Sequence, residues 1–277
     1  MCGRYASSSR PEDLIEEFEV DEDRMGLASR SILVAPQSPP AGQPDFNIAP
    51  TKQAPVVLTR SVRGDVDRPP TRQLRLLTWG LVPSWAKDIK VGLRMINARS
   101  ESLLTASSFV RAATSRRCLV PADGWYEWQA SPTARDAKGK PRRQPFFVRR
   151  SDGARLAMAG LYEFWRDGSL AEDDPDAWLT TYAIITTAAE PGLDRIHDRQ
   201  PLVLERQGWD DWLDPTQTDL SSVKSHLEFA EPGRFDAYPV GTAVNRSGNN
   251  GEQLLLPAAR SDLVGVVDPT TGEVIGE

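Results

Sequence analysis

Short apolar runs, rather than long helical repeats, dominate the hydrophobic pattern of this chain. Seven of them have the length and composition of β-strands, at residues 55–59, 74–82, 118–121, 146–149, 156–161, 182–187 and 201–204. Their spacing is irregular, and no series of strands alternates with long helices, which argues against a doubly wound parallel sheet. The pattern predicts an α+β fold with a β-rich, largely antiparallel core.

Helical patterns are few and short, so we expect helices only at the periphery. The serines at positions 7–9 followed by Pro11 predict a helix start, because proline suits the first turn of a helix. Leu14 and Phe18 would then lie on its apolar face. Two further helices are predicted over residues 102–113 and 208–213.

Segments of loop composition separate these elements. Residues 26–44 are rich in serine and proline and predict an irregular surface insertion. Residues 130–144 predict a polar, basic loop between strands, and residues 167–176 an exposed acidic loop. Residues 258–277 lack core-forming periodicity, so we expect a loosely ordered tail.

The charge of the chain limits the partners that it can bind. Its 277 residues carry a net charge of −6, which argues against a protein that coats nucleic acid by bulk electrostatics. Residues 90–117 nevertheless contain six lysines and arginines against one glutamate, a local charge of +5. Residues 166–178 hold five acidic side chains, Glu172 among them, against one arginine. The basic segment can bind phosphates locally, because fields act within a Debye length of ~8–10 Å; a solvated helix face is the alternative.

Cysteine and histidine usage excludes several classes of site. The two cysteines, Cys2 and Cys118, form no disulfide framework and fit a reducing compartment. The two histidines are not spaced for zinc, and no glycine-rich phosphate loop is present, so we expect neither a metal nor a cofactor. No apolar run suits a secretory signal or approaches the ~18 residues of a membrane span.

Cys2 has the most informative position in the chain. It follows Met1, and a side chain as small as cysteine normally permits removal of that methionine. The mature chain would then carry an α-amine and a thiol on one residue, a pair that captures aldehydes as a five-membered thiazolidine. The second attack is intramolecular, and effective molarities can reach ~10⁵ M or more. The alternative is a cysteine without a role at this position.

Three other segments carry the residue types that such chemistry requires. Asn97 and Arg99 would share one face of an extended segment, although a capped strand end is also compatible. Glu127 lies among three aromatic residues, which would raise its pKa for proton transfer near pH 7, unless it is exposed on a hairpin. His197 precedes Arg199 and suits an acid, a base or a phosphate contact, or an ordinary hydrogen-bonded loop.

Two loops combine aromatic residues with prolines. Residues 46–51 include Asn47 and Pro50, and residues 79–85 include Trp85. Such loops can stack on splayed bases, which contributes ~1–3 kcal/mol per base. Tryptophan side chains more commonly pack in the core, so core packing remains an alternative to base stacking for these loops.

The motifs, taken together, are specific. In chain order they are MCGRY, FNIAPT, WGLVPSW, INAR, RCLVPADGWYEW, QPFF, AGLYEFW, ITTAA, IHDRQPLVL and GNNGEQL. The chain resembles the SRAP family (SOS response-associated peptidase-like proteins), which shield abasic sites in single-stranded DNA. The resemblance implies a single SRAP domain over residues 2–257, with a barrel-like core and peripheral helices, followed by the tail at 258–277.

The resemblance also implies roles for individual residues. Cys2 would crosslink to the aldehyde of an abasic site, with Asn97, Glu127 and His197 around it, and without a metal or cofactor. The partner would be single-stranded DNA containing abasic sites, bound by a cytoplasmic monomer that associates with the nucleoid. Abasic-site lyase and autopeptidase activities are compatible with the same residues. The positions expected to contact DNA are Arg4, Asn47, Pro50, Trp85, Arg99 and Arg199.

Two other functions fit these residues. A cysteine peptidase or N-terminal nucleophile hydrolase would use the Cys2 thiol, with His197 or the α-amine as base. Acetylation of the amine separates the two reactions, since crosslinking should vanish while His-assisted hydrolysis should persist. A non-catalytic binder of single-stranded nucleic acid would use the aromatic and arginine side chains, and would be insensitive to Cys2→Ala.

Overall fold

The computed structural model describes residues 2–27, 30–32, 36–60, 69–171, 173–227 and 232–276. Glu172, predicted to lie in the acidic loop, falls outside the described residues. The strands are β1 (Tyr5–Ser7), β2 (Glu22–Asp23), β3 (Asp45–Ile48), β4 (Gln53–Arg60), β5 (Thr71–Trp79), β6 (Asn97–Arg99), β7 (Arg117–Ala122), β8 (Gly124–Arg135), β9 (Pro141–Arg150), β10 (Leu156–Arg166), β11 (Trp178–Ala188), β12 (Arg199–Pro201) and β13 (Phe235–Pro239). The α-helices are α1 (Pro11–Glu17), α2 (Val110–Ser115), α3 (Trp209–Leu213) and α4 (Leu220–Ser225). Short 3₁₀ helices are η1 (Ile89–Arg94), η2 (Ser100–Ser102), η3 (Pro175–Ala177), η4 (Leu193–Arg195), η5 (Arg206–Gly208), η6 (Thr242–Asn245), η7 (Glu252–Leu255) and η8 (Arg260–Leu263).

Five strands close into a barrel. β11, β10, β7, β4 and β5 pair in that order, each antiparallel to the next. A parallel pairing of β11 with β5, at Thr181 with Thr78 and Tyr182 with Trp79, completes the ring. Closure satisfies the backbone groups that an open sheet would leave at its edges. The predicted α+β fold with a β-rich, largely antiparallel, barrel-like core is confirmed.

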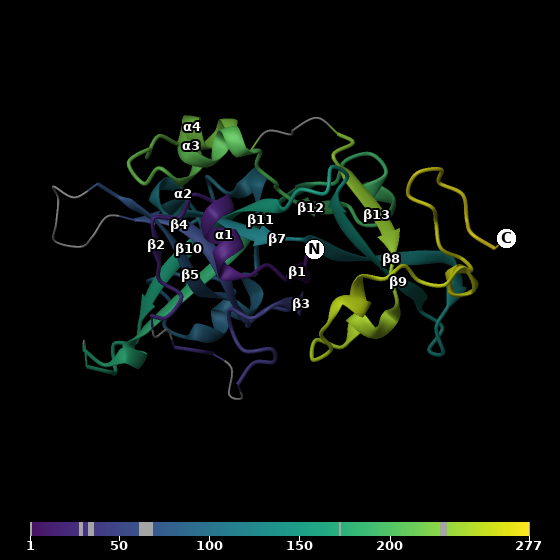
Figure 1. The fold of residues 1–277 in the computed structure, drawn as a ribbon, viewed down its shortest axis with the longest axis horizontal. Helices are drawn as coiled ribbons and strands as arrows, with labels where there is room; N and C mark the ends of the chain where they lie inside the picture. Colours follow the sequence, from purple (N-terminus) through teal and green to yellow (C-terminus); the bar gives the residue numbers. More distant parts are fainter. Residues whose placement is uncertain are drawn as a thin grey trace.

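A second sheet extends from one end of the barrel. Its order is β13–β9–β8–β1–β3, and all of its pairs are antiparallel. Figure 1 shows the N-terminus between the barrel strands and the β8–β9–β13 region, with α3 and α4 over the barrel and the C-terminus beyond the second sheet. Barrel residues such as Tyr182 share one apolar cluster with Trp125 and Val148 of the second sheet. The start of the chain is therefore fixed where the two sheets meet.

The helices cover the outside of the barrel, as predicted. Leu14 of α1, Ala112 of α2 and Trp212 of α3 are buried against strand residues such as Leu119. Pro11 occupies the first turn of α1, but the N-cap is Arg10 and makes no side-chain cap, so the serines do not cap this helix. The helix predicted over 208–213 is confirmed as η5 followed by α3.

The single helix predicted over residues 102–113 is wrong. The segment is broken into η2 and α2, with turns between them. Its middle is rich in serine and threonine, whose side chains compete for backbone groups; the hydroxyl of Thr105 donates to the carbonyl of Ser102. Local side-chain hydrogen bonds thus favour turns here over a continuous helix.

The polar loop predicted over residues 130–144 is also wrong. Most of it extends β8 and β9 into a long hairpin. The turn is closed by Asp136, whose carboxylate accepts from the backbone amides of Lys138 and Lys140, and by Gly139 at φ +75°. The exposed end of the hairpin carries polar residues along both faces, so the apolar alternation that marks a strand is missing.

Two predicted strands end earlier than expected. β5 stops at Trp79, because Gly80 turns the chain at φ +126°, and a side chain there would meet the carbonyl oxygen of Gly92 at 2.6 Å. β12 stops at Pro201, although Leu202 and Leu204 remain buried. In both segments the apolar residues face a core without belonging to a strand.

Candidate active site

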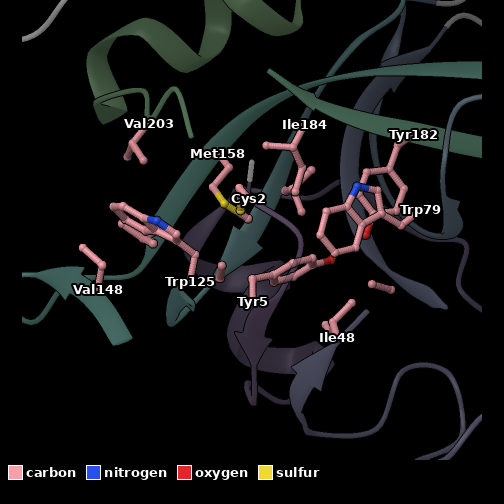
Figure 2. Close-up of a cluster of buried hydrophobic side chains, with 14 of the residues drawn as sticks. Cys2, Tyr5, Ile48, Trp79, Trp125, Val148, Met158, Tyr182, Ile184 and Val203 are labelled. Atoms are coloured by element: carbon pink, nitrogen blue, oxygen red, sulfur yellow. The ribbon is translucent and has the colours of Figure 1, made fainter. Parts of the chain in front are cut away.

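Cys2 lies immediately before β1, at the junction of the two sheets. It is fully buried, in the same apolar cluster as Met158, Trp125 and Tyr5 (Figure 2). Burial raises the pKa of the thiol well above its ordinary value, and the charge of Glu127 raises it further. The thiol is therefore protonated at neutral pH in this state, and the α-amine is the better first nucleophile of the pair.

Asn97 fixes the backbone of Cys2. It begins β6, which runs parallel to β11 with Asn97 opposite Ile184. Its Nδ2 donates to the carbonyl oxygen of Cys2 at 2.8 Å. Its Oδ1 is buried without a hydrogen-bond partner among the residues that the structure describes, so it can accept a hydrogen bond from a substrate hydroxyl or an amine.

Trp79 holds the strand that carries Asn97. Its indole Nε1 donates to the carbonyl oxygen of Ile96 at 2.8 Å, one residue before Asn97. Trp79 is fully buried and packs edge-on against Tyr5, with ring centroids 5.2 Å apart. The role of Trp79 could not be predicted from its aromatic loop, since it depends on a hydrogen bond to a main-chain carbonyl that no motif identifies.

Glu127 is held on β8, opposite Phe146 of β9. β8 pairs with β1 through Tyr5 and Trp125, so the carboxylate is carried by a strand directly beside the one that follows Cys2. Glu127 is 4% exposed, and burial, reinforced by the charge of Asp198, raises its pKa to about 7. The carboxyl can therefore both donate and accept a proton near neutral pH.

His197 lies between η4 and β12. Its Nδ1 accepts from the backbone amide of Arg199 at 3.0 Å and is also 2.9 Å from a carboxylate oxygen of Asp198. The two contacts require different protonation states; an amide donates permanently, whereas the Asp198 side chain is 85% exposed and forms a weak, screened pair. We therefore assign the neutral ring with its proton on Nε2, in agreement with burial, which lowers the pKa of His197.

Arg4 and Asn47, both expected on DNA, contact a loop of the protein. Arg4 donates to Oδ1 of Asn47 and to the carbonyl of Val244, each at 2.8 Å. Asn47 is fully buried, and its amide donates to the carbonyls of Val244, Arg246 and Asn249. In this conformation both residues fix the 244–249 loop, and contact of Asn47 with DNA would require that loop to move.

The other positions expected on DNA differ in accessibility. Trp85 is 60% exposed, Arg99 is exposed and Pro50 is partly exposed. Arg199 is 12% exposed in its side chain and pairs with both carboxylate oxygens of Glu101 while donating to the carbonyl of Thr186. Trp85 and Arg99 thus present accessible stacking and cationic groups, whereas Arg199 is already engaged.

A buried pair of tyrosines supports this site. The hydroxyls of Tyr5 and Tyr182 are 2.6 Å apart and tie β1 to β11. Replacing Tyr5 with phenylalanine leaves the other hydroxyl buried without its partner, so we expect a loss of ~1–2 kcal/mol in the free energy of unfolding. Urea unfolding measures this, and the Tyr5→Phe/Tyr182→Phe double variant should lose less than the sum of the two single variants. Additive losses would contradict a direct interaction.

No group of three or more histidine, cysteine, aspartate or glutamate residues within the described ranges is arranged to hold a metal ion. Among those same residues, no helix has both the length and the apolar character needed to cross a membrane.

Comparison with known proteins identifies relatives over nearly the whole chain. The family model "SOS response associated peptidase (SRAP)" matches residues 1–247. The abasic site processing protein YoqW of Bacillus subtilis is 35% identical over 257 residues, which cover 92% of this chain and 99% of that protein. The abasic site processing protein HMCES of Mus musculus is 30% identical over 289 residues, covering 93% of this chain and 76% of that protein.

Solved structures share the fold. A protein from Bacteroides thetaiotaomicron superposes with a TM-score of 0.69 at 19% identity, covering 93% of this chain and all of that one. A phage-related protein from Bordetella bronchiseptica has a TM-score of 0.57 at 33% identity and covers 86% of this chain and 94% of its own. The barrel with its second sheet is therefore a fold found in other bacterial proteins.

Proposed function

Because this chain belongs to the SOS response associated peptidase family, we propose that it processes abasic sites in DNA by covalent capture at Cys2. Relatives at 30–35% identity are named abasic site processing proteins. The observation that carries the proposal is the environment of Cys2. Asn97 donates a hydrogen bond to the carbonyl oxygen of Cys2, and the charge of Glu127, whose pKa is about 7, raises the pKa of the Cys2 thiol. An α-amine and a thiol on one residue beside such a carboxyl suit the capture of an aldehyde.

The reaction begins with opening of the abasic sugar. The bond between C1′ and the ring oxygen breaks, the ring oxygen takes up a proton, and the anomeric hydroxyl loses its own to give the aldehyde. The Nε2 proton of His197 donates a hydrogen bond to the ring oxygen as it leaves C1′. Oδ1 of Asn97 accepts a hydrogen bond from the attacking amine and so orients it.

Capture then proceeds in two bond-forming steps. The neutral amine of Cys2, with a reference pKa of ~7.7–8.0, attacks C1′ to give a carbinolamine. Protonated Glu127 donates a proton to the carbinolamine hydroxyl, which leaves as water, and the resulting carboxylate takes the remaining proton from nitrogen, which gives the neutral imine and restores the acid. The thiol adds to C1′ while its proton passes to the imine nitrogen, so aldehyde and aminothiol become thiazolidine and water. Prompt ring closure competes with β-elimination, which would break the strand.

A denaturing gel tests the proposal. Mature protein, with removal of Met1 verified by mass, is mixed with a single strand carrying one abasic site and with the same strand carrying an intact base. The expected result is a covalent, heat-stable band with the abasic strand alone. The proposal is wrong if that protein gives no band. Hydrolysis of a peptide bond by an N-terminally acetylated sample would instead favour a cysteine peptidase.

We also propose that a monomer of this protein binds single-stranded DNA through Trp85. This indole is 60% exposed, and stacking on a base contributes ~1–3 kcal/mol. Trp85→Ala should therefore weaken non-covalent binding of a single strand about tenfold while leaving the crosslinking rate at saturating DNA unchanged. Fluorescence anisotropy measures the affinity, with Leu256→Ala, which removes another exposed apolar side chain, as the control. Equal affinities of the Trp85→Ala and Leu256→Ala proteins would contradict a stacking role.

A further inference from the structure

The C-terminal segment packs against β8 and the η4 turn, although it lies beyond the residues that the family model matches. That match ends at residue 247, whereas the structure describes the chain to residue 276. Leu263 and Val266 are buried in the same apolar cluster as Cys2. The tail, expected from its sequence to be loosely ordered, is thus attached to the core in this structure, and the domain boundary at residue 257 stays a prediction.

A small hairpin in this segment contacts the exposed side chain of Arg195. Val267 and Val274 form a bridge across its base. Nη1 of Arg195 donates to the carbonyl oxygens of Pro269 at 2.6 Å and Thr270 at 3.2 Å. Gly272, at φ +80°, lies in this hairpin next to Arg195, and a Cβ there would lie 3.4 Å from Nε of Arg195. The guanidinium of Arg195 is therefore bound by main-chain carbonyls of the tail.

Gln129 joins the same hairpin to the strand of Glu127. It is 2% exposed and lies two residues after Glu127, on the same face of β8. Its Nε2 donates to the carbonyls of Arg195 at 3.1 Å and Val267 at 2.9 Å, and its Oε1 accepts from the amide of Val267 at 2.8 Å. One buried amide therefore connects β8, the η4 turn and the tail.

His197 is tied to the η4 turn by a main-chain hydrogen bond. The amide of His197 donates to the carbonyl of Leu193, the first residue of η4, at 3.0 Å. On the other side of His197, the main-chain carbonyl of Asp198 accepts from the amide of Ala189 at 3.0 Å. The position of the imidazole thus depends on the η4 turn, which the tail holds from outside.

We propose that residues 263–275 act as a brace that positions His197 relative to Glu127, and that Arg195 and Gln129 are positioning residues. This inference rests on the proposed function, in which both groups act on one sugar. Catalytic groups must be held to within a fraction of an ångström, and misplacement by about 1 Å can lower a rate about 100-fold. The brace supplies that constraint from a part of the chain outside the matched family domain.

Arg195→Met tests the brace, because it keeps the aliphatic stem and removes both hydrogen bonds to the tail. We expect the single-turnover crosslinking rate at saturating abasic DNA to fall about tenfold, with the Kd for the intact-base strand within about twofold of the wild-type value. Arg195→Lys, which retains a cationic donor, should recover part of the rate. Arg166→Met is the matched control, because Arg166 is also exposed and donates to a main-chain carbonyl, that of Leu170, outside residues 263–275.

A double-mutant cycle with His197→Ala separates positioning from general destabilisation. If Arg195 acts through His197, adding Arg195→Met to His197→Ala should change the rate less than about twofold. A tenfold loss in both backgrounds, or no loss in the wild-type background, overturns the inference. Failure of the wild-type protein to crosslink abasic DNA would instead refute the proposed function itself.

Discussion

Replacing Cys2 with alanine is expected to abolish the heat-stable crosslink to an abasic site while leaving a reducible imine. The variant keeps the α-amine, so attack on C1′ and loss of water remain available. It lacks the thiol, whose intramolecular addition has an effective molarity of ~10⁵ M or more. The imine then persists long enough for β-elimination, so strand cleavage should increase as the crosslink disappears.

Gel electrophoresis with and without cyanoborohydride measures both outcomes. The reductant should trap a covalent band with Cys2→Ala, and its omission should give cleaved DNA. Cys118→Ala is the matched control, because Cys118 is the other cysteine of the chain and is fully buried in β7. A heat-stable band that survives Cys2→Ala without reductant would show that another residue captures the aldehyde.

Much of the fold could be predicted from the sequence because its strands are short, apolar and buried. β4, β7, β10 and β11 contain the predicted runs, since most of their side chains face one of two cores. The strand predicted over residues 146–149 lies in β9, but the outer part of the β8–β9 hairpin was missed, because its exposed end is polar on both faces. Periodicity reports burial, and where a strand is not buried the signal disappears.

The candidate site could likewise be predicted from the sequence only in part. Cys2, Asn97 and Glu127 could be selected because each has a side chain with distinctive chemistry in a specific motif. The tyrosine pair and the support of Asn97 by Trp79 were missed, since they depend on pairings between distant strands. Asn47 was placed on DNA by its motif, yet its amide is occupied by carbonyls of residues 244–249. Bonds to main-chain carbonyls carry no sequence pattern, so only the structure reveals them.

Glu127→Gln is expected to slow crosslinking about 100- to 1000-fold and to stabilise the protein above pH 7. The rate falls because glutamine has no proton to give to the departing hydroxyl, and a general acid contributes ~10²–10⁴-fold. In the wild-type protein the reactive form has Glu127 protonated and the amine neutral. Because the pKa of Glu127 is about 7 and that of the amine ~7.7–8.0, the rate should peak between about pH 7 and 8. The variant should lose the descending limb that reports ionisation of Glu127.

The stability of the two proteins should diverge with pH in a definite direction. Burial raises the pKa of Glu127 from 4.5 to about 7, so the folded state binds this proton more tightly than the unfolded state. Between those values the folded protein holds more protons, and its stability falls as the pH rises, by about 3 kcal/mol in total. A neutral glutamine removes this dependence, so the variant should gain stability at pH 8 and little at pH 4.

Urea unfolding of both proteins at pH 4 and pH 8 measures this difference. The matched control is Glu163→Gln, because Glu163 is also buried but pairs with Arg116 at 2.9 Å. That variant should lose stability at pH 8, where it breaks an ion pair, and should keep the wild-type crosslinking rate. A Glu127→Gln protein that is less stable than wild type at pH 8 would mean that the carboxylate is held by compensating contacts, and the proton-transfer role would lose its physical basis. Gain of stability together with loss of rate would instead mark Glu127 as a group kept for chemistry at the expense of folding.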